Sequence, residues 1–105
     1  LALGVEWGDV AEVSRSLGTE VAVNELVAYS DLTKELRDRI SERSFLIASF
    51  ALCGFANLGS VGIQLGGIGG IPPSRRPVLA RLALRAMLAG AFASWMTAAL
   101  AGGLA

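Results

Sequence analysis

The chain has 105 residues, of which 53% are hydrophobic and none is His, with a mean hydropathy of +0.58 and a formal net charge of zero. This composition is more apolar than that of an average soluble domain, and the length is short for a complete multi-span membrane protein. We therefore interpret the sequence as part of a membrane protein, and its start at Leu1 rather than Met is what a segment of a longer chain shows. A single cysteine, Cys53, excludes an internal disulfide and a thiolate metal cluster.

The first element that the sequence predicts is a re-entrant helical hairpin at residues 9–31. Residues 9–16 have the apolar spacing of a short amphipathic helix. The mostly apolar segment 17–29 falls short of the roughly 20 residues that a spanning helix needs. Gly18-Thr19 is expected to form the turn between the two arms. Glu20 is expected to lie near the hairpin tip or to face solvent, without a functional role.

A charged connector at residues 31–43 leads to the most informative stretch, residues 44–71, which contain no charged side chain. A continuous helix of that length would reach about 42 Å, at about 1.5 Å per residue, beyond a hydrocarbon core of about 30 Å. The polar run from Gly54 to Ser60 lies at its centre, so a discontinuous transmembrane helix is expected over 40–70. Irregular backbone at membrane depth persists only where it is buried in protein or lines a cavity. The break is therefore a candidate binding site.

The prolines within residues 71–77 end this helix, Ser74 is expected to cap the next one, and a last transmembrane helix is expected at 76–103. The positive-inside rule places the basic end of that helix in the cytoplasm. A nucleic-acid-binding patch is disfavoured, because apolar spans flank the basic residues. The basic residues of this region are Arg75, Arg76, Arg81 and Arg85.

Four short motifs make the chain recognisable: GVEW, NELVAY, ALCGFANLGS and PSRR, at residues 4–7, 24–29, 51–60 and 73–76. In order and approximate spacing they resemble the C-terminal region of the concentrative nucleoside transporters, and the resemblance covers essentially the whole chain. The second and third motifs are specific, whereas the first and last are weak alone. Leu26 stands where the family usually has Phe, and Glu20 where it often has Lys.

The resemblance implies an all-α membrane fold, as a fragment of a homotrimeric elevator-type transporter that imports nucleosides with a coupling cation. Residues 1–105 would supply the second half of the mobile transport domain, with the hairpin at 9–31, the broken helix at 40–70 and the last helix at 76–103. The coupling cation, Na⁺ or H⁺, would be held mainly by the other half, and no metal site or cofactor is implied here. The expected partners are the nucleoside, the lipid bilayer and the N-terminal part of the same transporter. The expected location is the plasma membrane, as a multi-pass protein of a bacterial inner membrane.

By the same resemblance, the carboxylate that hydrogen-bonds the ribose falls on Glu25, and the aromatic, amide and hydroxyl ligands fall on Phe55, Asn57 and Ser60. These residue types suit a nucleoside, which joins a neutral, hydroxyl-rich sugar to a flat aromatic base. A carboxylate accepts strong charge-assisted hydrogen bonds from hydroxyls, and an Asn amide both donates and accepts. Phe55 offers an apolar surface.

Each candidate also has a structural interpretation that the sequence leaves open. Glu25 is alternatively a carboxylate that only reaches water, and Phe55 an ordinary core residue. Asn57 is alternatively a partner for backbone groups at the break, and Ser60 a hydroxyl bonded to its own i−4 carbonyl. The glycines of residues 66–70 lack the basic residue and the strand-turn-helix context of a phosphate-binding loop.

Two other function classes compete with a transporter. A membrane-embedded enzyme needs a nucleophile and a base or a metal cluster, and a chain without His offers only Glu25 with Ser60, so the sequence predicts no enzyme and no catalytic residue. A structural or assembly subunit with no solute site is the alternative. It does not need Asn57 and Glu25 inside apolar surroundings, where such groups are costly.

Overall fold

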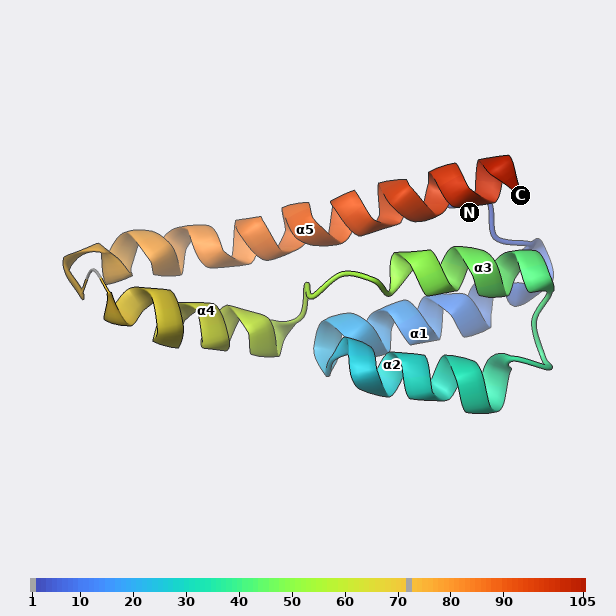
Figure 1. The fold of residues 1–105 in the computed structure, drawn as a ribbon, viewed down its shortest axis with the longest axis horizontal. Helices are drawn as coiled ribbons and strands as arrows, with labels where there is room; N and C mark the ends of the chain where they lie inside the picture. Colours follow the sequence, from blue (N-terminus) through green and yellow to red (C-terminus); the bar gives the residue numbers. More distant parts are fainter. Residues whose placement is uncertain (1, 72) are drawn as a thin grey trace.

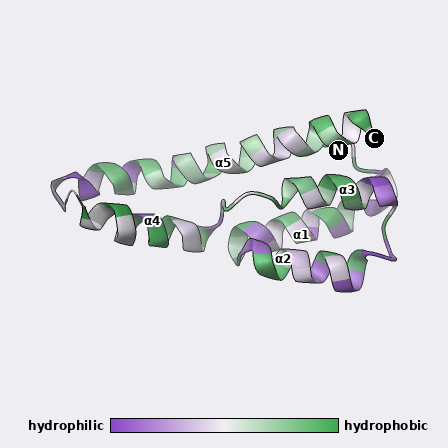
Figure 2. Ribbon diagram, viewed as in Figure 1, coloured by the Kyte–Doolittle hydropathy of each residue, from purple (hydrophilic) through white to green (hydrophobic). Residues whose placement is uncertain are grey.

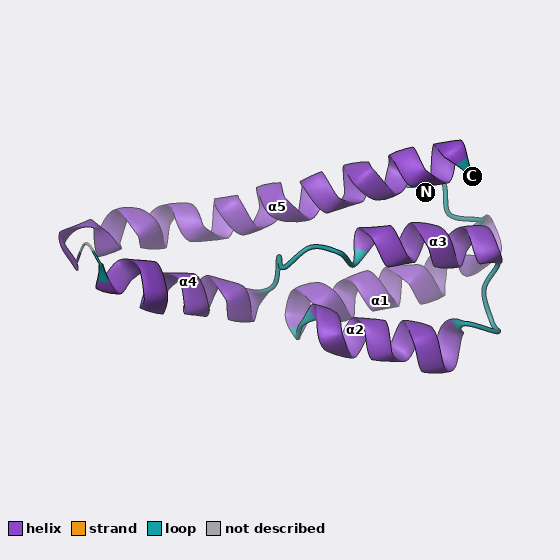
Figure 3. Ribbon diagram, viewed as in Figure 1, coloured by secondary structure: helices purple, strands orange, loops and turns teal. Residues whose placement is uncertain are grey.

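The computed structural model describes residues 2–71 and 73–105. Leu1 and Pro72, which belong to the predicted domain and the predicted interhelical loop, lie outside them. The described residues form helices joined by short loops, with no strand among them (Figure 3). The prediction of an all-α fold is therefore confirmed. The molecule is elongated, with a longest extent of 49 Å, and its last helix runs along that whole axis (Figure 1).

Two antiparallel helices form the N-terminal part of the structure. A 3-10 turn, η1 (Trp7–Asp9), leads into α1 (Val10–Ala22), and α2 (Glu25–Asp31) returns beside it (Figure 1). The chain then continues as a π-helical segment, η2 (Leu32–Leu36). Leu32 and Leu36 are buried, as is Ile40 in the connector beyond them. The apolar side of the charged connector is thus part of the core.

The turn between α1 and α2 lies at Val23 and Asn24, so the prediction of a turn at Gly18-Thr19 is wrong. Asn24 has extended backbone angles, and its side-chain oxygen accepts a hydrogen bond from the Val27 N–H at 2.9 Å. Asn is among the strongest N-cap residues, whereas a helix interior tolerates one Gly at a cost of about 1 kcal/mol. The cap therefore sets the position of the turn.

The second half of the chain contains two shorter helices and one long helix. They are α3 (Glu42–Ala51), α4 (Leu58–Gly70) and α5 (Arg76–Leu104), the last preceded by a 3-10 turn, η3 (Pro73–Arg75). The Ser41 side chain caps α3 by accepting from the Ser44 N–H. No side chain caps α5 within the described residues, so the prediction for Ser74, which lies inside η3, is wrong.

The segment 52–57 between α3 and α4 is not helical (Figure 3). In Figure 1, α3 and α4 lie one after the other along the same side of α5. α4 therefore lies along the N-terminal half of α5, and α3 lies along its C-terminal half. The non-helical segment sits near the middle of the long axis, close to the start of α2.

Two buried clusters hold these elements together. The larger one joins α1, α2, η2, α3 and α5, and includes Val13, Leu32, Ile47 and Ala98. The smaller one lies at the break and consists of Ala56, Met87 and Ala91. Trp95 of α5 packs against both clusters.

The helices α4 and α5 also carry large apolar side chains that nothing in the described chain covers. Figure 2 shows both helices as mostly hydrophobic or neutral, with a hydrophilic segment at the start of α5. The stretch Pro73–Leu104 is the one described helix that is long and apolar enough to cross a membrane. The exposed side chains include Ile63, Ile68, Leu88, Phe92, Met96 and Leu100.

A first prediction concerns the contact between the C-terminal end of α5 and α3. A Cβ added to Gly102 would lie 2.8 Å from Ile47 side-chain carbons and 3.2 Å from a backbone oxygen, so Gly102→Ala is expected to lower stability by about 1–3 kcal/mol through overpacking. Gly103→Ala is the control, because a Cβ there meets nothing within 4 Å. Thermal unfolding of the complete protein in detergent measures both. Equal midpoints for the two variants would contradict the contact.

Candidate functional site

The start of α2 and the start of α4 meet through one hydrogen bond between side chains 32 residues apart. The Asn57 Nδ2 group donates to the Glu25 Oε2 atom at 3.0 Å. Glu25 is the first residue of α2, and Asn57 is the N-cap of α4. An ionised carboxylate only accepts hydrogen bonds, so the amide nitrogen of Asn57 must be the atom that faces it. The break in the second half of the chain is thereby joined to the hairpin.

Asn57 is held in place by a capping box with Ser60. Its Oδ1 atom accepts from the Ser60 N–H at 2.8 Å, and its own N–H donates to the Ser60 Oγ atom at 3.2 Å. The Ser60 hydroxyl in turn donates to the Asn57 carbonyl oxygen at 2.6 Å. Both side chains are buried. This reciprocal pattern fixes a helix start, so it fixes the direction in which Asn57 points toward Glu25.

Glu25 keeps acceptor capacity for a further ligand. It is half-buried, and no hydrogen bond from another described residue reaches its Oε1 atom. It also lies near the positive end of α4, where a helix dipole favours a negative charge. The carboxylate is thus oriented on one oxygen and open on the other.

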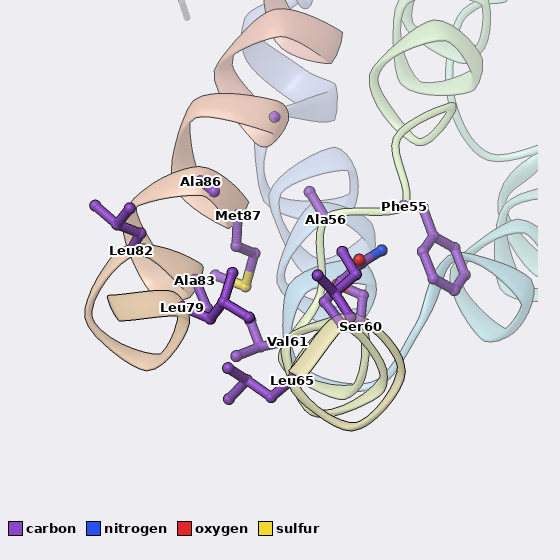
Figure 4. Close-up of a pocket in the computed structure, with 13 residues that line it drawn as sticks. Phe55, Ala56, Ser60, Val61, Leu65, Leu79, Leu82, Ala83, Ala86 and Met87 are labelled. Atoms are coloured by element: carbon purple, nitrogen blue, oxygen red, sulfur yellow. The ribbon is translucent and has the colours of Figure 1, made fainter. Parts of the chain in front are cut away.

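Phe55 lies two residues before Asn57 and is 56% exposed, so it is not a core residue of the described chain. It contributes to the lining of a cavity of about 380 Å³ between α4 and α5. Figure 4 shows Leu79 and Met87 of α5 facing Val61 and Leu65 of α4 across this cavity. Glu25 and Asn57 do not line it. We place the candidate site at Glu25 and Asn57, where polar groups converge, because most of the cavity wall is apolar, with Ser60 and Gln64 as its polar lining residues.

The four predicted site residues therefore fall into two groups. Glu25, Asn57 and Ser60 form one hydrogen-bonded chain. Phe55 shares the 52–57 segment with that chain and lines the cavity between α4 and α5 together with Ser60. The role of all four as ligands stays a prediction.

Glu20 lies two residues before the end of α1 and therefore near the hairpin tip, as predicted, but it is only 2% exposed, so the alternative prediction that it faces solvent is wrong. Because α1 continues through Gly18 and Thr19, Glu20 falls two helical turns after buried Val13, on the same face. The segment 52–57 passes close to it. A Cβ added to Gly54 would lie 3.6 Å from the Glu20 Oε1 atom and would overlap the Ser94 Oγ atom of α5. A glycine is needed there because the loop runs between α1 and α5.

Comparison with known proteins gives one family for nearly the whole chain. A family model described as the C-terminus of Na⁺ dependent nucleoside transporters matches residues 1–102. Solute carrier family 28 member 3 of Homo sapiens is 44% identical over 95% of this chain and 16% of its own length. The nucleoside permease NupC of Helicobacter pylori is 39% identical over 95% of this chain and 25% of its own length. The chain thus spans about a quarter or less of the relatives that it matches.

Solved structures agree with this match. A structure of the transporter CNTnw in an inward-facing, substrate-bound state is 40% identical, with a TM-score of 0.89 over 95% of this chain and 25% of that chain. A variant of CNTnw in an outward-facing state gives a TM-score of 0.90, at 39% identity, over 98% of this chain and 26% of that chain. Because the family model matches residues 1–102 and these relatives match nearly the whole chain, the chain belongs to the Na⁺ dependent nucleoside transporter family and corresponds to its C-terminal region.

Proposed function

We propose that this chain supplies half of the nucleoside-binding transport domain of a cation-coupled nucleoside importer. The hydrogen bond between Glu25 and Asn57 carries the proposal, because it joins the tip of the hairpin to the break in the next helix. Polar groups inside an apolar membrane segment are costly and are kept where they serve a solute. The nucleoside permease NupC among the relatives, and the family of Na⁺ dependent nucleoside transporters to which the chain belongs, support the choice of solute.

The chemistry of the site fits a ribose. Ribose hydroxyls donate to the open oxygen of Glu25, and a bond to an ionised acceptor contributes about 1.5–3 kcal/mol. Asn57 holds the other oxygen, so the carboxylate does not have to be ordered when the sugar binds. The exposed ring of Phe55 lies at the same break and offers an apolar face to the sugar or the base. Ser60 acts indirectly in this scheme, through Asn57.

A rigid-body movement of this unit fits the structural comparisons. The chain matches an inward-facing and an outward-facing structure of CNTnw about equally well. That similarity supports an elevator-type transport domain, in which hairpin, broken helix and last helix move together against a scaffold in a homotrimer. The hairpin of α1 and α2 would be re-entrant, and α3 with α4 would form the broken transmembrane helix. The coupling cation, Na⁺ or H⁺, would be bound mainly by the part of the transporter outside this chain.

A plasma-membrane location, with a bacterial inner membrane as the specific case, fits the exposed apolar surfaces of α4 and α5. The arginines at the start of α5 are exposed, and the positive-inside rule places that end in the cytoplasm. The remaining chain of the transporter and the lipid would then cover the apolar surface. No enzymatic activity is proposed, because the family is one of transporters.

Uptake of labelled uridine by cells that express the complete transporter tests this proposal. We expect uptake above that of cells carrying the empty vector, competition by unlabelled nucleosides, and no competition by free ribose phosphate. Replacing external Na⁺ by choline, and separately dissipating the proton gradient, identifies the coupling cation. Expression at the cell surface without uptake of any nucleoside would contradict the proposal.

A further inference from the structure

Glu20 is a buried carboxyl group that the proposed nucleoside site does not use. It lies near the end of α1 and is 2% exposed. No hydrogen bond or ion pair joins its side chain to any other residue of the described ranges, where the one ion pair is that of Arg39 with Glu12. Gly54 and Ser94 close around it from the loop and from α5.

No positively charged side chain of the described residues lies beside Glu20. The ionisable groups on the neighbouring elements are acidic, or they lie at distant positions along their helices. The ionisable residues of α2 are Glu25, Tyr29 and Asp31, and none of them is a base. The Tyr29 hydroxyl is already bonded to the Ser49 carbonyl oxygen and to the Cys53 Sγ atom. Cys53 is the ionisable residue of the 52–57 segment. None of these supplies a positive charge.

The remaining helices bring no base either. α4 contains no ionisable residue, and the ionisable residues of α3, Glu42 and Arg43, lie in its first turn, at the end away from the break. The last arginine of α5, Arg85, lies nine residues before Ser94. On α1 itself, Arg15 is exposed and unpaired within the described chain.

A charged carboxylate without a partner in such a place is strongly unfavourable, and in practice the group becomes neutral instead. Glu25 is hydrogen-bonded to Asn57, three residues after the Gly54 that lies beside Glu20, and a negative charge there disfavours a second one nearby. A proton needs only one acceptor, whereas a metal ion needs several ligands, and the described residues contain no group of three or more His, Cys, Asp or Glu side chains that would hold one. Proton binding is thus the chemistry that fits this group.

We propose that the Glu20 carboxyl group is a proton-binding site of the transport domain, and that release of its proton weakens nucleoside binding at Glu25. Binding moves one proton from water to the carboxylate, and release returns it to water. Only the effect of this proton on nucleoside binding rests on the proposed function. Its physical reason is that an ionised Glu20 repels Glu25 and must draw water or donors into the packing between α1, the 52–57 segment and α5.

Infrared difference spectroscopy of the complete, purified transporter tests the first half without any nucleoside. A protonated carboxylic acid has a carbonyl stretching band that an ionised carboxylate lacks. We expect the wild type to show such a band at neutral pH that disappears as the pH is raised. Glu20→Gln and Glu20→Met should lose this band, whereas Glu25→Gln and Glu35→Gln should keep it. Glu20→Met fills a similar volume without a polar group, so it serves if the amide of Gln is not tolerated. A band that survives in both Glu20 variants would overturn the proposal.

Equilibrium binding of labelled uridine to the same samples at fixed Na⁺ tests the second half, since no proton gradient acts on it. The affinity of the wild type should fall as the pH is raised, and that of Glu20→Gln should stay constant over the same range. Glu35→Gln, which removes an exposed carboxylate of η2, should follow the wild type. An unchanged alkaline loss in Glu20→Gln would overturn the link to binding. Absence of uridine binding in every sample would count against the proposed function. The infrared measurement would then decide alone whether Glu20 binds a proton.

Discussion

Glu25→Gln is expected to weaken nucleoside binding to the complete transporter by roughly 1.5–3 kcal/mol, because it keeps the size of the side chain but removes its charge-assisted hydrogen bonds. This corresponds to a loss of affinity of about tenfold to 150-fold. In this structure the carboxylate has one oxygen bound by the Asn57 amide and the other open. The variant thus changes the acceptor strength of a group whose position is otherwise set by α2 and Asn57.

Comparison of uridine with its 2′- and 3′-deoxy analogues separates a ligand from a structural carboxylate. An analogue without the bonded hydroxyl has already lost much of that interaction, so Glu25→Gln should penalise it less than uridine. A structural role predicts equal losses for all three nucleosides. Binding is measured at equal surface expression, with Glu35→Gln as the control for removal of one negative charge. Equal losses, or none, would remove Glu25 from the site.

The elements of the chain that could be predicted from sequence are those with a local cause. Residues 44–71 are uncharged with polar groups at the centre, and the structure has non-helical backbone at 52–57 between two helices. Asn57, a strong N-cap residue three positions before Ser60, starts the second of these. The bond from Asn57 to Glu25 has no such local signal. It depends on how the hairpin packs against the break, which only the resemblance to a family indicated.

The burial of Glu20 was not predicted from the sequence, although the sequence contains a signal for it. Placing the turn at Gly18-Thr19 separated Glu20 from the helical pattern before it. With one helix from Val10 to Ala22, the positions 13, 16 and 20 share a face, and all three are buried. The capping preference of Asn24 was the signal that would have moved the turn. The enclosure of Glu20 by Gly54 and Ser94 is a tertiary contact and could not be predicted in this way.

Asn57→Asp is expected to reduce nucleoside binding by about 3 kcal/mol, or about 150-fold, at the upper end of what loss of a hydrogen bond to a charged group costs. Asp is as good an N-cap as Asn, so its side chain can still accept from the Ser60 N–H and α4 should still begin at the same residue. What changes is the contact with Glu25. A donor 3.0 Å from the carboxylate is replaced by a second carboxyl group, and two negative charges at this distance repel each other.

The pH dependence of this variant distinguishes the pairing from the cap. As the pH is lowered, the carboxyl group introduced by Asn57→Asp and that of Glu25 share one proton, which restores a donor between them, so binding should partly recover. Asn57→Ala loses both the cap and the donor and has no group to protonate, so its binding should stay low at every pH. Equilibrium binding of uridine to both variants at several pH values, with circular dichroism to confirm equal helix content, makes the comparison. If Asn57→Asp and Asn57→Ala behave alike throughout, the importance of Asn57 lies in starting α4 and not in holding the Glu25 carboxylate for the sugar.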